Sequence, residues 1–210
     1  KVYLYLETEQ LALKCGVLTN GQYTSSDRGI SGASTIVLEY VLDTPSLNLR
    51  YGVSLISVEQ AKRNLEREIN NYDLKVLSEA GRRIWNEKLG KISVTGGSEQ
   101  DKTVFYTSLY RTYERMICIS EDGKYYSAFD GKVHNDYGIP FYTDDWIWDT
   151  YRAVHPLRVI IEPKMETDMI SSFIRMAEQM EQFWMPTFPE ITGDTRRMNS
   201  NHGVATVIDA

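Results

Sequence analysis

The stretch SLISVEQAKRNLEREI, residues 54–69, divides the chain into two parts of different character. Before it, side chains alternate in polarity, as they do over Val2–Leu6, and a period of two is typical of a half-buried β-strand. From Ser57 onward apolar residues recur every three or four positions, and Ser57 followed by Gln60 fits a helix capping box. We therefore predict strands over residues 1–56 and mainly helices after Ser57.

Turn signals cut the strand region into several short runs. They lie at Asn20-Gly21, Ser31-Gly32 and Asp43-Thr44-Pro45. Short strands at such intervals are typical of a β-sandwich, but these strands are too few to close one and would leave exposed edges. We expect the missing strands upstream of Lys1, so that this region is the end of a sandwich.

Helical patterns occupy much of the remaining chain. The second predicted helix covers Asp73–Lys91. A third begins after Ser98, where Asp101 fits a capping box, and continues to about Cys118. The stretch Ser120–Thr143 is rich in Gly, Tyr and Asp, and we predict an irregular loop there. Loops of this length are often functional.

Two further helices are predicted beyond this loop. One begins at about Asp145, and Pro163 suits the first turn of the next. The expected buried stripe of that next helix consists of Met169, Ile170, Phe173, Ile174 and Ala177. Its expected solvent-exposed face consists of Glu162, Glu166 and Asp168.

The composition argues against two classes of protein. A net charge of −6 argues against nucleic-acid binding, because phosphate contacts require clustered Lys and Arg. We expect no membrane span, because a spanning helix needs a long apolar run that this sequence lacks. The 14 Tyr and 4 Trp permit a carbohydrate site, since aromatic faces can cover the C–H faces of a sugar ring.

The cysteines and histidines lack the spacing of a metal site. Cys15 and Cys118 lie far apart, and two buried thiols are favoured over a disulfide, although the pairing stays open. His134, His155 and His202 have no spacing partner that would indicate zinc. We interpret His155 as a core or helix-end residue. His202 lies in a polar loop and is either a loop hydrogen-bonder or a site residue.

The densest group of chemically useful residues is FYTDDWIWDTYR, residues 141–152. In a helix, Asp144 and Trp148 would share a face, and an aromatic ring beside a carboxylate suits a pyranoside, because the ring can stack on the sugar while the carboxylate accepts hydroxyl protons. In a helix, Asp145 and Asp149 would share a face, and such a carboxylate pair could also serve a glycosidase. The segment is therefore a candidate sugar site.

Structural interpretations compete with this one. Asp144 or Asp145 could cap the helix and favour its dipole. Asp149 could pair with Arg152 on the next turn, a contact worth only about 0.2–0.5 kcal/mol. The tryptophans could also belong to the core.

Several segments resemble glycoside hydrolase family 92, in order and with family-like spacing. They are Ser57–Glu68, Lys102–Tyr110, Phe129–His134, Tyr142–Asp144 with Trp148–Leu157, and Asn201–Ala210. The resemblance extends from about residue 33 to the end of the chain. It implies an exo-acting α-mannosidase that cleaves mannose-containing glycans with inversion, assisted by calcium. It also implies a secreted, periplasmic or cell-surface protein.

The fold implied by the resemblance is α+β. It has the end of an N-terminal β-sandwich over residues 1–56, linker helices over 57–97, and the first helices of an (α/α)6 barrel over 98–210. Trp148 and Asp149 match the motif that lines the family's mannose site. His202 matches a later segment, although the preceding Arg197–Ser200 departs from the family's residues.

The family's catalytic acid lies in a Gly-Asn-Glu-Pro motif and its base in a Gly-Asn-Asp motif, and neither motif occurs here. We therefore assign no catalytic residue and no metal ligand within this chain. The acid, the base and most calcium ligands are expected in the rest of a longer polypeptide, which we call the parent protein. The alternatives for this chain are a non-catalytic carbohydrate-binding module and a structural helical domain.

Overall fold

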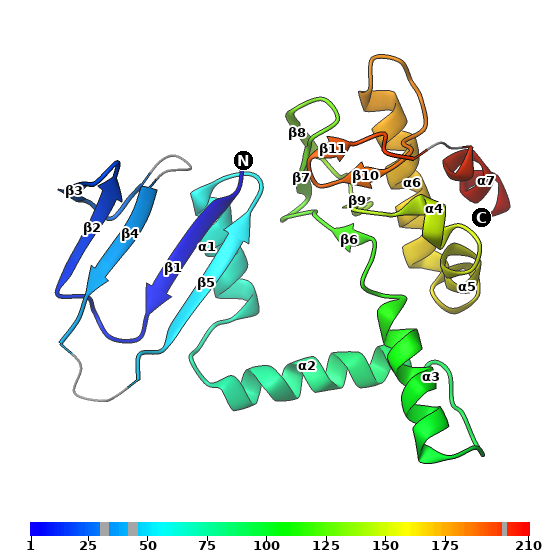
Figure 1. Ribbon diagram of the computed structural model, residues 1–210, viewed down its shortest axis with the longest axis horizontal. Coiled ribbons are helices and arrows are strands. Elements are labelled where there is room, and N and C mark those ends of the chain that lie inside the picture. The colour runs from blue at the N-terminus through cyan, green and yellow to red at the C-terminus, as the bar shows by residue number, and fades with distance from the viewer. Residues whose placement is uncertain (30–33, 42–45, 199–200) are drawn as a thin grey trace. The chain divides into compact units, whose positions relative to one another are not determined.

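A computed structural model describes residues 1–29, 34–41, 46–198 and 201–210 (Figure 1). The predicted turns at Ser31-Gly32 and Asp43-Thr44-Pro45 lie outside these residues. By its internal contacts the chain forms two compact units, which we call the N-terminal unit (Val2–Leu74) and the C-terminal unit (Lys75–Ala210). The first helix groups with the strands, and the domain limits after residues 56 and 97 stay predictions about the parent protein.

The N-terminal unit contains two small antiparallel sheets. In one, β1 (Tyr3–Thr8) pairs with β5 (Leu49–Ser54). In the other, β2 (Lys14–Thr19) lies between β3 (Gln22–Ser25) and β4 (Ser34–Glu39). The prediction of antiparallel strands before Ser57 is confirmed for the described residues.

The predicted turn at Asn20-Gly21 joins β2 to β3. Both residues have positive φ, 50° for Asn20 and 80° for Gly21. Asn-Gly is favoured in two-residue hairpin loops, because both central positions require positive φ there. The local sequence therefore accounts for this hairpin.

Helix α1 (Val58–Glu68) covers the sheet of β1 and β5. The predicted cap is present, because the Ser57 side chain accepts a hydrogen bond from the Gln60 N–H at 3.1 Å. Gly52 of β5 lies so close to the helix that a Cβ built on it would be 2.2 Å from the carbonyl oxygen of Ala61. A glycine at this position permits the close packing of helix on sheet.

Many apolar side chains of the strands stay exposed. Leu4, Tyr51 and Val53 share one face of the sheet of β1 and β5, and each is more than a third exposed. In a β-sandwich such a face is covered by a second sheet. These strands therefore have apolar surface that the described residues leave uncovered.

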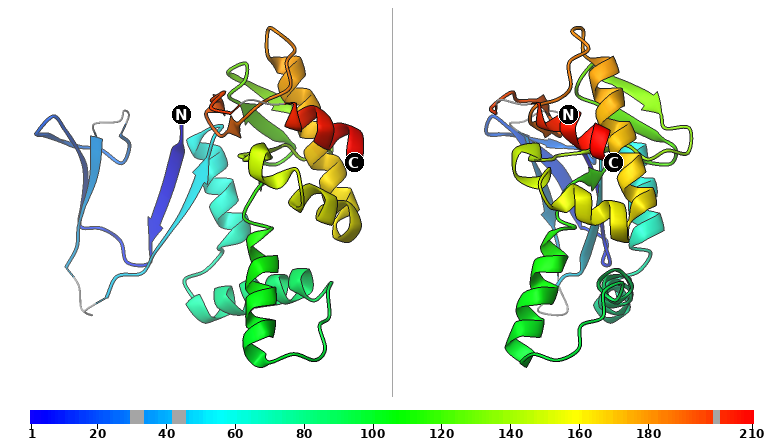
Figure 2. Two further views of the ribbon diagram at one scale, coloured as in Figure 1. Left: turned by 45° about the vertical axis from the view of Figure 1, so that its right-hand side comes forward. Right: turned by 90° about the vertical axis from the view of Figure 1, so that its right-hand side faces the viewer.

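The C-terminal unit is mainly helical. Its helices are α2 (Leu74–Leu89), α3 (Glu99–Arg111), α4 (Ile147–Thr150), α5 (Val154–Ile161), α6 (Pro163–Gln179) and α7 (His202–Asp209). Figure 2 shows α5 beside α6, and α7 beside α6 and α4. The capping box of Ser98 and Asp101 is present in both directions, and Pro163 occupies the first turn of α6, as predicted.

The predicted third helix is too long. It ends at Arg111, and β6 (Ile117–Cys118) pairs instead with β9 (Tyr142–Thr143). The Ile119 N–H continues this pairing by donating to the Phe141 carbonyl at 2.9 Å. Local periodicity cannot report a partner strand so distant in sequence.

The predicted irregular loop is partly regular. Strands β7 (Lys124–Ser127) and β8 (Lys132–Asn135) form a hairpin within it. Gly131, at a φ of 74°, closes this hairpin by donating its N–H to the Ser127 carbonyl at 3.0 Å. A further short hairpin joins β10 (Pro189–Glu190) to β11 (Gly193–Asp194).

Helix α6 passes through the core of this unit, and its predicted acidic face is not solvent-exposed. The core residues are Met116, Tyr125, Phe141, Ile147, Met169, Phe173 and Met176. Glu162, Glu166 and Asp168 are all buried, at 7%, 1% and 6% exposure. Each has a basic partner, respectively Lys88 with Lys91, His155, and Lys164. The prediction was wrong because three of these four partners, all except Lys164, come from segments outside α6.

Both cysteines are free thiols, which confirms the favoured prediction about their pairing. The prediction that both thiols are buried is wrong, because Cys15 is only half-buried and Cys118 is exposed. Over the described ranges, no helix is long and apolar enough to cross a membrane.

Candidate functional site

Helix α4 is a single turn that holds one side chain inward and two outward. Ile147 is completely buried in the core, whereas Trp148 is 47% exposed and Asp149 is also exposed. No side-chain hydrogen bond caps this helix, whose N-cap residue is Trp146. The predicted sugar-site residues Trp148 and Asp149 therefore lie on the surface of the C-terminal unit.

The structure excludes two structural roles considered for the neighbouring carboxylates. Asp144, at a φ of 65°, pairs with Arg115 at 2.6 Å and does not cap α4. Asp145 precedes the helix and does not cap it either. Among the described residues, Arg152 donates through Nε to the Tyr151 hydroxyl at 2.8 Å and forms no ion pair with Asp149.

Asp145 and Asp149 do not form an exposed carboxylate pair. Asp145 is completely buried, and it lies before the start of α4 and so does not share a helix face with Asp149. In the part of the chain that the structure describes, the Asp149 carboxylate has no hydrogen-bond or ion-pair partner. The hypothesis of a glycosidase pair on one helix face is therefore wrong.

His202, the third predicted site residue, contacts Trp148. Its ring lies 5.0 Å from that of Trp148, edge to face at 72°, and stacks on Tyr151 at 4.1 Å and 17°. His202 is the first residue of α7, so two distant segments meet here. Sequence reasoning missed Tyr151, and no local signal indicates it, because its contact with His202 depends on how distant segments pack.

A close approach of α7 to α4 makes this contact possible. A Cβ built on Gly203 would lie 3.2 Å from the Pro186 carbonyl oxygen and 3.5 Å from Cδ1 of Ile147. The small residue after His202 therefore lets the start of α7 pack against α4. Asn199 and Ser200, which belong to the predicted polar loop, lie outside the described residues.

Trp146 has a different environment from Trp148. The Arg115 guanidinium lies 3.8 Å from the centroid of the Trp146 ring, and Phe188 stacks near it at 6.0 Å. Cation–π and stacking contacts of this kind already engage the ring. Of these two tryptophans, Trp148 is therefore the better candidate for a sugar contact.

Beneath α4 lies a buried ionic network. His155 Nε2 lies 3.0 Å from Asp145 Oδ2, and Nδ1 lies 2.7 Å from Glu166 Oε1, so each ring nitrogen faces a carboxylate. Burial alone would lower the pKa of His155, but the hydrogen bonds and charges of the two carboxylates outweigh it and raise the pKa to about 9. An imidazolium fits this geometry, because only the charged ring donates from both nitrogens. His155 is thus a core histidine, as predicted.

Arg158 lies in the same buried region. Desolvation lowers its pKa from the usual value, although the charges of Glu166 and Asp145 act in the opposite direction. Three buried atoms have no hydrogen-bond partner within the described residues, namely Asp145 Oδ1, Arg158 Nε and Glu166 Oε2. Unpaired buried groups are costly, so this network is not optimised for stability alone.

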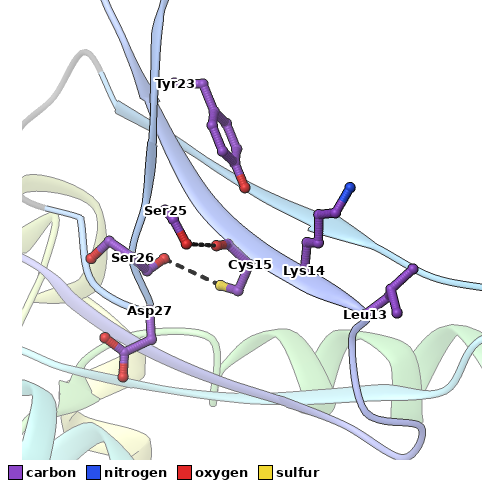
Figure 3. Close-up of a pocket in the computed structure, with 7 residues that line it drawn as sticks. All are labelled: Leu13, Lys14, Cys15, Tyr23, Ser25, Ser26 and Asp27. Carbon is purple, nitrogen blue, oxygen red and sulfur yellow. Dashed lines mark hydrogen bonds between the residues drawn. The ribbon is translucent and has the colours of Figure 1, made fainter.

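A separate hollow of about 440 Å³ lies in the N-terminal unit (Figure 3). It is lined by Leu13, Lys14, Cys15, Tyr23, Ser25, Ser26 and Asp27. The Cys15 thiol donates to the Ser26 carbonyl at 3.3 Å, and the hollow is open to solvent. It contains none of the residues predicted to bind sugar.

The described residues do not form a calcium site by themselves. Among them, no group of three or more His, Cys, Asp or Glu side chains is arranged to hold a metal ion. Calcium takes six to eight oxygen ligands, usually including several carboxylates. The predicted calcium therefore stays a prediction about the parent protein.

Comparison with known proteins identifies the family. A sequence model of the glycosyl hydrolase family 92 catalytic domain matches residues 60–210. A protein from Arthroderma benhamiae named as an uncharacterized secreted glycosidase is 34% identical over 70 residues, which are 31% of this chain and 9% of that protein.

Solved structures share the fold. A family GH92 inverting mannosidase from Bacteroides thetaiotaomicron VPI-5482 is 28% identical with a TM-score of 0.83, over 99% of this chain and 28% of that one. A family GH92 alpha-mannosidase from Bacteroides thetaiotaomicron is 20% identical with a TM-score of 0.84, over 98% of this chain and 29% of that one. This chain therefore spans less than a third of the length of these relatives.

Proposed function

Because this chain belongs to glycosyl hydrolase family 92, we propose that it is part of an α-mannosidase and contributes a mannose-contacting surface of Trp148, Asp149 and His202. The likeness to mannosidases supports the substrate class. One observation carries the choice of residues: the ring of His202, from a distant segment, contacts Trp148 next to the unpartnered carboxylate of Asp149.

Each side chain has a role that its surroundings permit. The exposed ring of Trp148 stacks on the C–H face of a mannose residue. The Asp149 carboxylate accepts hydrogen bonds from mannose hydroxyls, and its charge strengthens them. His202, held by stacking on Tyr151, fixes the edge of Trp148 and offers a ring nitrogen to the sugar.

The chemical step belongs to the rest of the parent protein. An inverting glycosidase holds its acid and base about 6.5–9.5 Å apart with a water between them. Both motifs are missing from this chain, and Asp145, four residues before Asp149, is buried against His155. We assign this chain the tasks of binding and orienting the mannose residue.

The finer properties of the enzyme rest on the family. We propose exo-acting, inverting and calcium-dependent hydrolysis of mannose-containing glycans outside the cytoplasm. In this proposal residues 1–56 end a β-sandwich, 57–97 link the domains, and 98–210 begin an (α/α)6 barrel. The uncovered apolar face of the strands is consistent with a sandwich that other segments complete.

The test is hydrolysis of an aryl α-mannoside by the parent protein, followed by NMR of the first sugar product. We expect β-mannose to appear first, and a calcium chelator to stop turnover until calcium is restored. An enzyme that releases α-mannose first would contradict inversion, and unchanged turnover after chelation would contradict calcium dependence.

A second candidate is a non-catalytic mannose-binding module, which the missing acid and base motifs favour. The same experiment separates the two functions. A parent protein that binds mannose in calorimetry but turns over no aryl α-mannoside supports the binding module and contradicts the mannosidase. Absence of both binding and turnover contradicts both proposals and leaves the structural domain.

A further inference from the structure

The turn that carries Trp148 and Asp149 cannot be stable by itself. Helix α4 has only four residues and no side-chain cap at its N-terminus. Isolated helices of even about 12–15 residues are marginal in water, so a single turn must be held from outside. Groups that hold α4 also decide where Trp148 and Asp149 point.

The Asp145 residue holds both ends of this turn. Its N–H donates to the Pro189 carbonyl at 3.0 Å, which fixes the chain just before α4. Its carboxylate oxygen Oδ2 accepts from the Thr150 hydroxyl at 2.9 Å, at the last residue of α4. The Thr150 hydroxyl also lies 3.2 Å from the Trp146 carbonyl, so the turn is closed on itself.

Asp145 is held in turn by two other helices. The same oxygen Oδ2 accepts from His155 of α5 at 3.0 Å, and His155 donates to Glu166 of α6 at 2.7 Å. These three side chains are at most 2% exposed. The network therefore runs from the middle of the core to the base of the exposed turn.

We propose that Asp145, His155 and Glu166 are positioning residues that hold α4 so that the Asp149 carboxylate faces the mannose. This inference rests on the proposed function of Asp149. Buried ion networks are weak evidence for stability, because well-packed apolar residues often replace them without loss. Here two carboxylate oxygens of the network are also left without a partner among the described residues. A precise orientation of α4 accounts for keeping such a network.

The experiment is a double-mutant cycle in the parent enzyme, with kcat/KM for an aryl α-mannoside as readout. Thr150→Val removes the hydroxyl that joins α4 to Asp145 while keeping the side chain's size. We expect a three- to tenfold loss of kcat/KM, whereas Thr150→Ser, which keeps the hydroxyl, should retain wild-type values. In an Asp149→Asn background, Thr150→Val should cost less than twofold further, because the oriented carboxylate has already been changed.

Two more variants complete the design. Glu166→Gln changes the end of the network that lies farthest from α4. We expect it to lower kcat/KM about threefold, and we expect this loss to disappear in the Asp149→Asn background. Thr112→Val is the matched control, because that hydroxyl donates to the Leu109 carbonyl at 2.7 Å and, among the described residues, makes no hydrogen bond to α4. Thr112→Val should leave kcat/KM unchanged.

The outcomes are distinguishable. A loss for Asp149→Asn with no loss for Thr150→Val, or with losses that multiply in the double variant, keeps the proposed function and overturns the positioning network. No loss for Asp149→Asn overturns the proposed role of Asp149 and the network with it. A loss that Thr150→Ser does not rescue also contradicts the network, because the hydroxyl would then not be the cause.

Discussion

Asp145 and Asp149 lie on either side of the start of one short helix, and their surroundings are opposite. Asp145 is completely buried and accepts hydrogen bonds from His155 and Thr150. Asp149 is exposed and has no hydrogen-bond or ion-pair partner within the described ranges. One carboxylate is thus fixed by the protein, and the other is available to a ligand.

This contrast teaches that residue type and spacing do not decide the role of a carboxylate. Both aspartates lie in the segment of residues 141–152, and their four-residue spacing suggested a shared helix face. The helix begins only at Ile147, so burial separates them. We assign Asp145 to holding the turn and Asp149 to contacting the sugar.

The largest expected effect tests whether either carboxylate is the catalytic acid or base. If neither is, the 210-residue chain alone should not hydrolyse an aryl α-mannoside. General acid and base groups each contribute roughly 10²–10⁴-fold, so losing both costs at least about 10⁴-fold. The measurement is turnover by the purified chain. Activity that persists after contaminating glycosidases are removed would contradict the conclusion that neither Asp145 nor Asp149 is the catalytic acid or base.

Stability should separate the two residues next. Asp145→Asn leaves the buried His155 with one charged partner, and removing one partner of a buried ion pair typically costs about 3–5 kcal/mol. Asp149→Asn changes an exposed side chain and should shift the free energy of unfolding by less than about 0.5 kcal/mol. Denaturant unfolding of both variants of the chain measures this difference. Equal effects would show that the two carboxylates are not in different environments.

The pH dependence of stability tests only the buried network of Asp145, His155 and Glu166. The pKa of His155 is raised from 6.5 to about 9, so its stabilising charge is fully present below pH 6.5. Between pH 6.5 and about pH 9, the folded state keeps a proton on His155 that the unfolded state has lost, so the free energy of unfolding falls as pH rises. This fall should be on the order of 3 kcal/mol, since one pKa unit corresponds to about 1.4 kcal/mol.

Thermal unfolding of the chain between pH 6 and 9.5 measures this fall. In His155→Gln the group that titrates is gone, so this part of the pH dependence should disappear. A variant with the same slope as the wild-type chain would mean that another group is responsible.

Much of the fold follows from local sequence, and the exceptions are informative. The caps at Ser57 and Ser98, the turn at Asn20-Gly21 and the start of α6 at Pro163 depend on neighbouring residues, and all were predicted correctly. The pairing of β6 with β9 and the burial of the α6 carboxylates depend on segments far away in the chain. No local period contains that information.

In the candidate site too, some features follow from local sequence and others depend on distant segments. Trp148, Asp149 and His202 were identified from residue type and family resemblance, and the contact between Trp148 and His202 supports their grouping. The sequence did not indicate Tyr151 as the ring on which His202 stacks, nor Asp145 as a buried residue. Both depend on how α4, α5 and α7 pack, which spacing within one helix cannot predict.

The most direct test of the sugar-contacting role is the kcat/KM of Asp149→Asn in the parent enzyme. The change keeps the shape of the side chain and removes the charge, and losing a hydrogen bond to a charged group costs about 1.5–3 kcal/mol. We therefore predict a loss of about ten- to a hundredfold with unchanged stability. Asp27→Asn, the same change at the exposed hollow of the N-terminal unit, is the matched control and should retain wild-type kinetics. Unchanged kcat/KM in Asp149→Asn would contradict the account, because this carboxylate would then not contact the mannose.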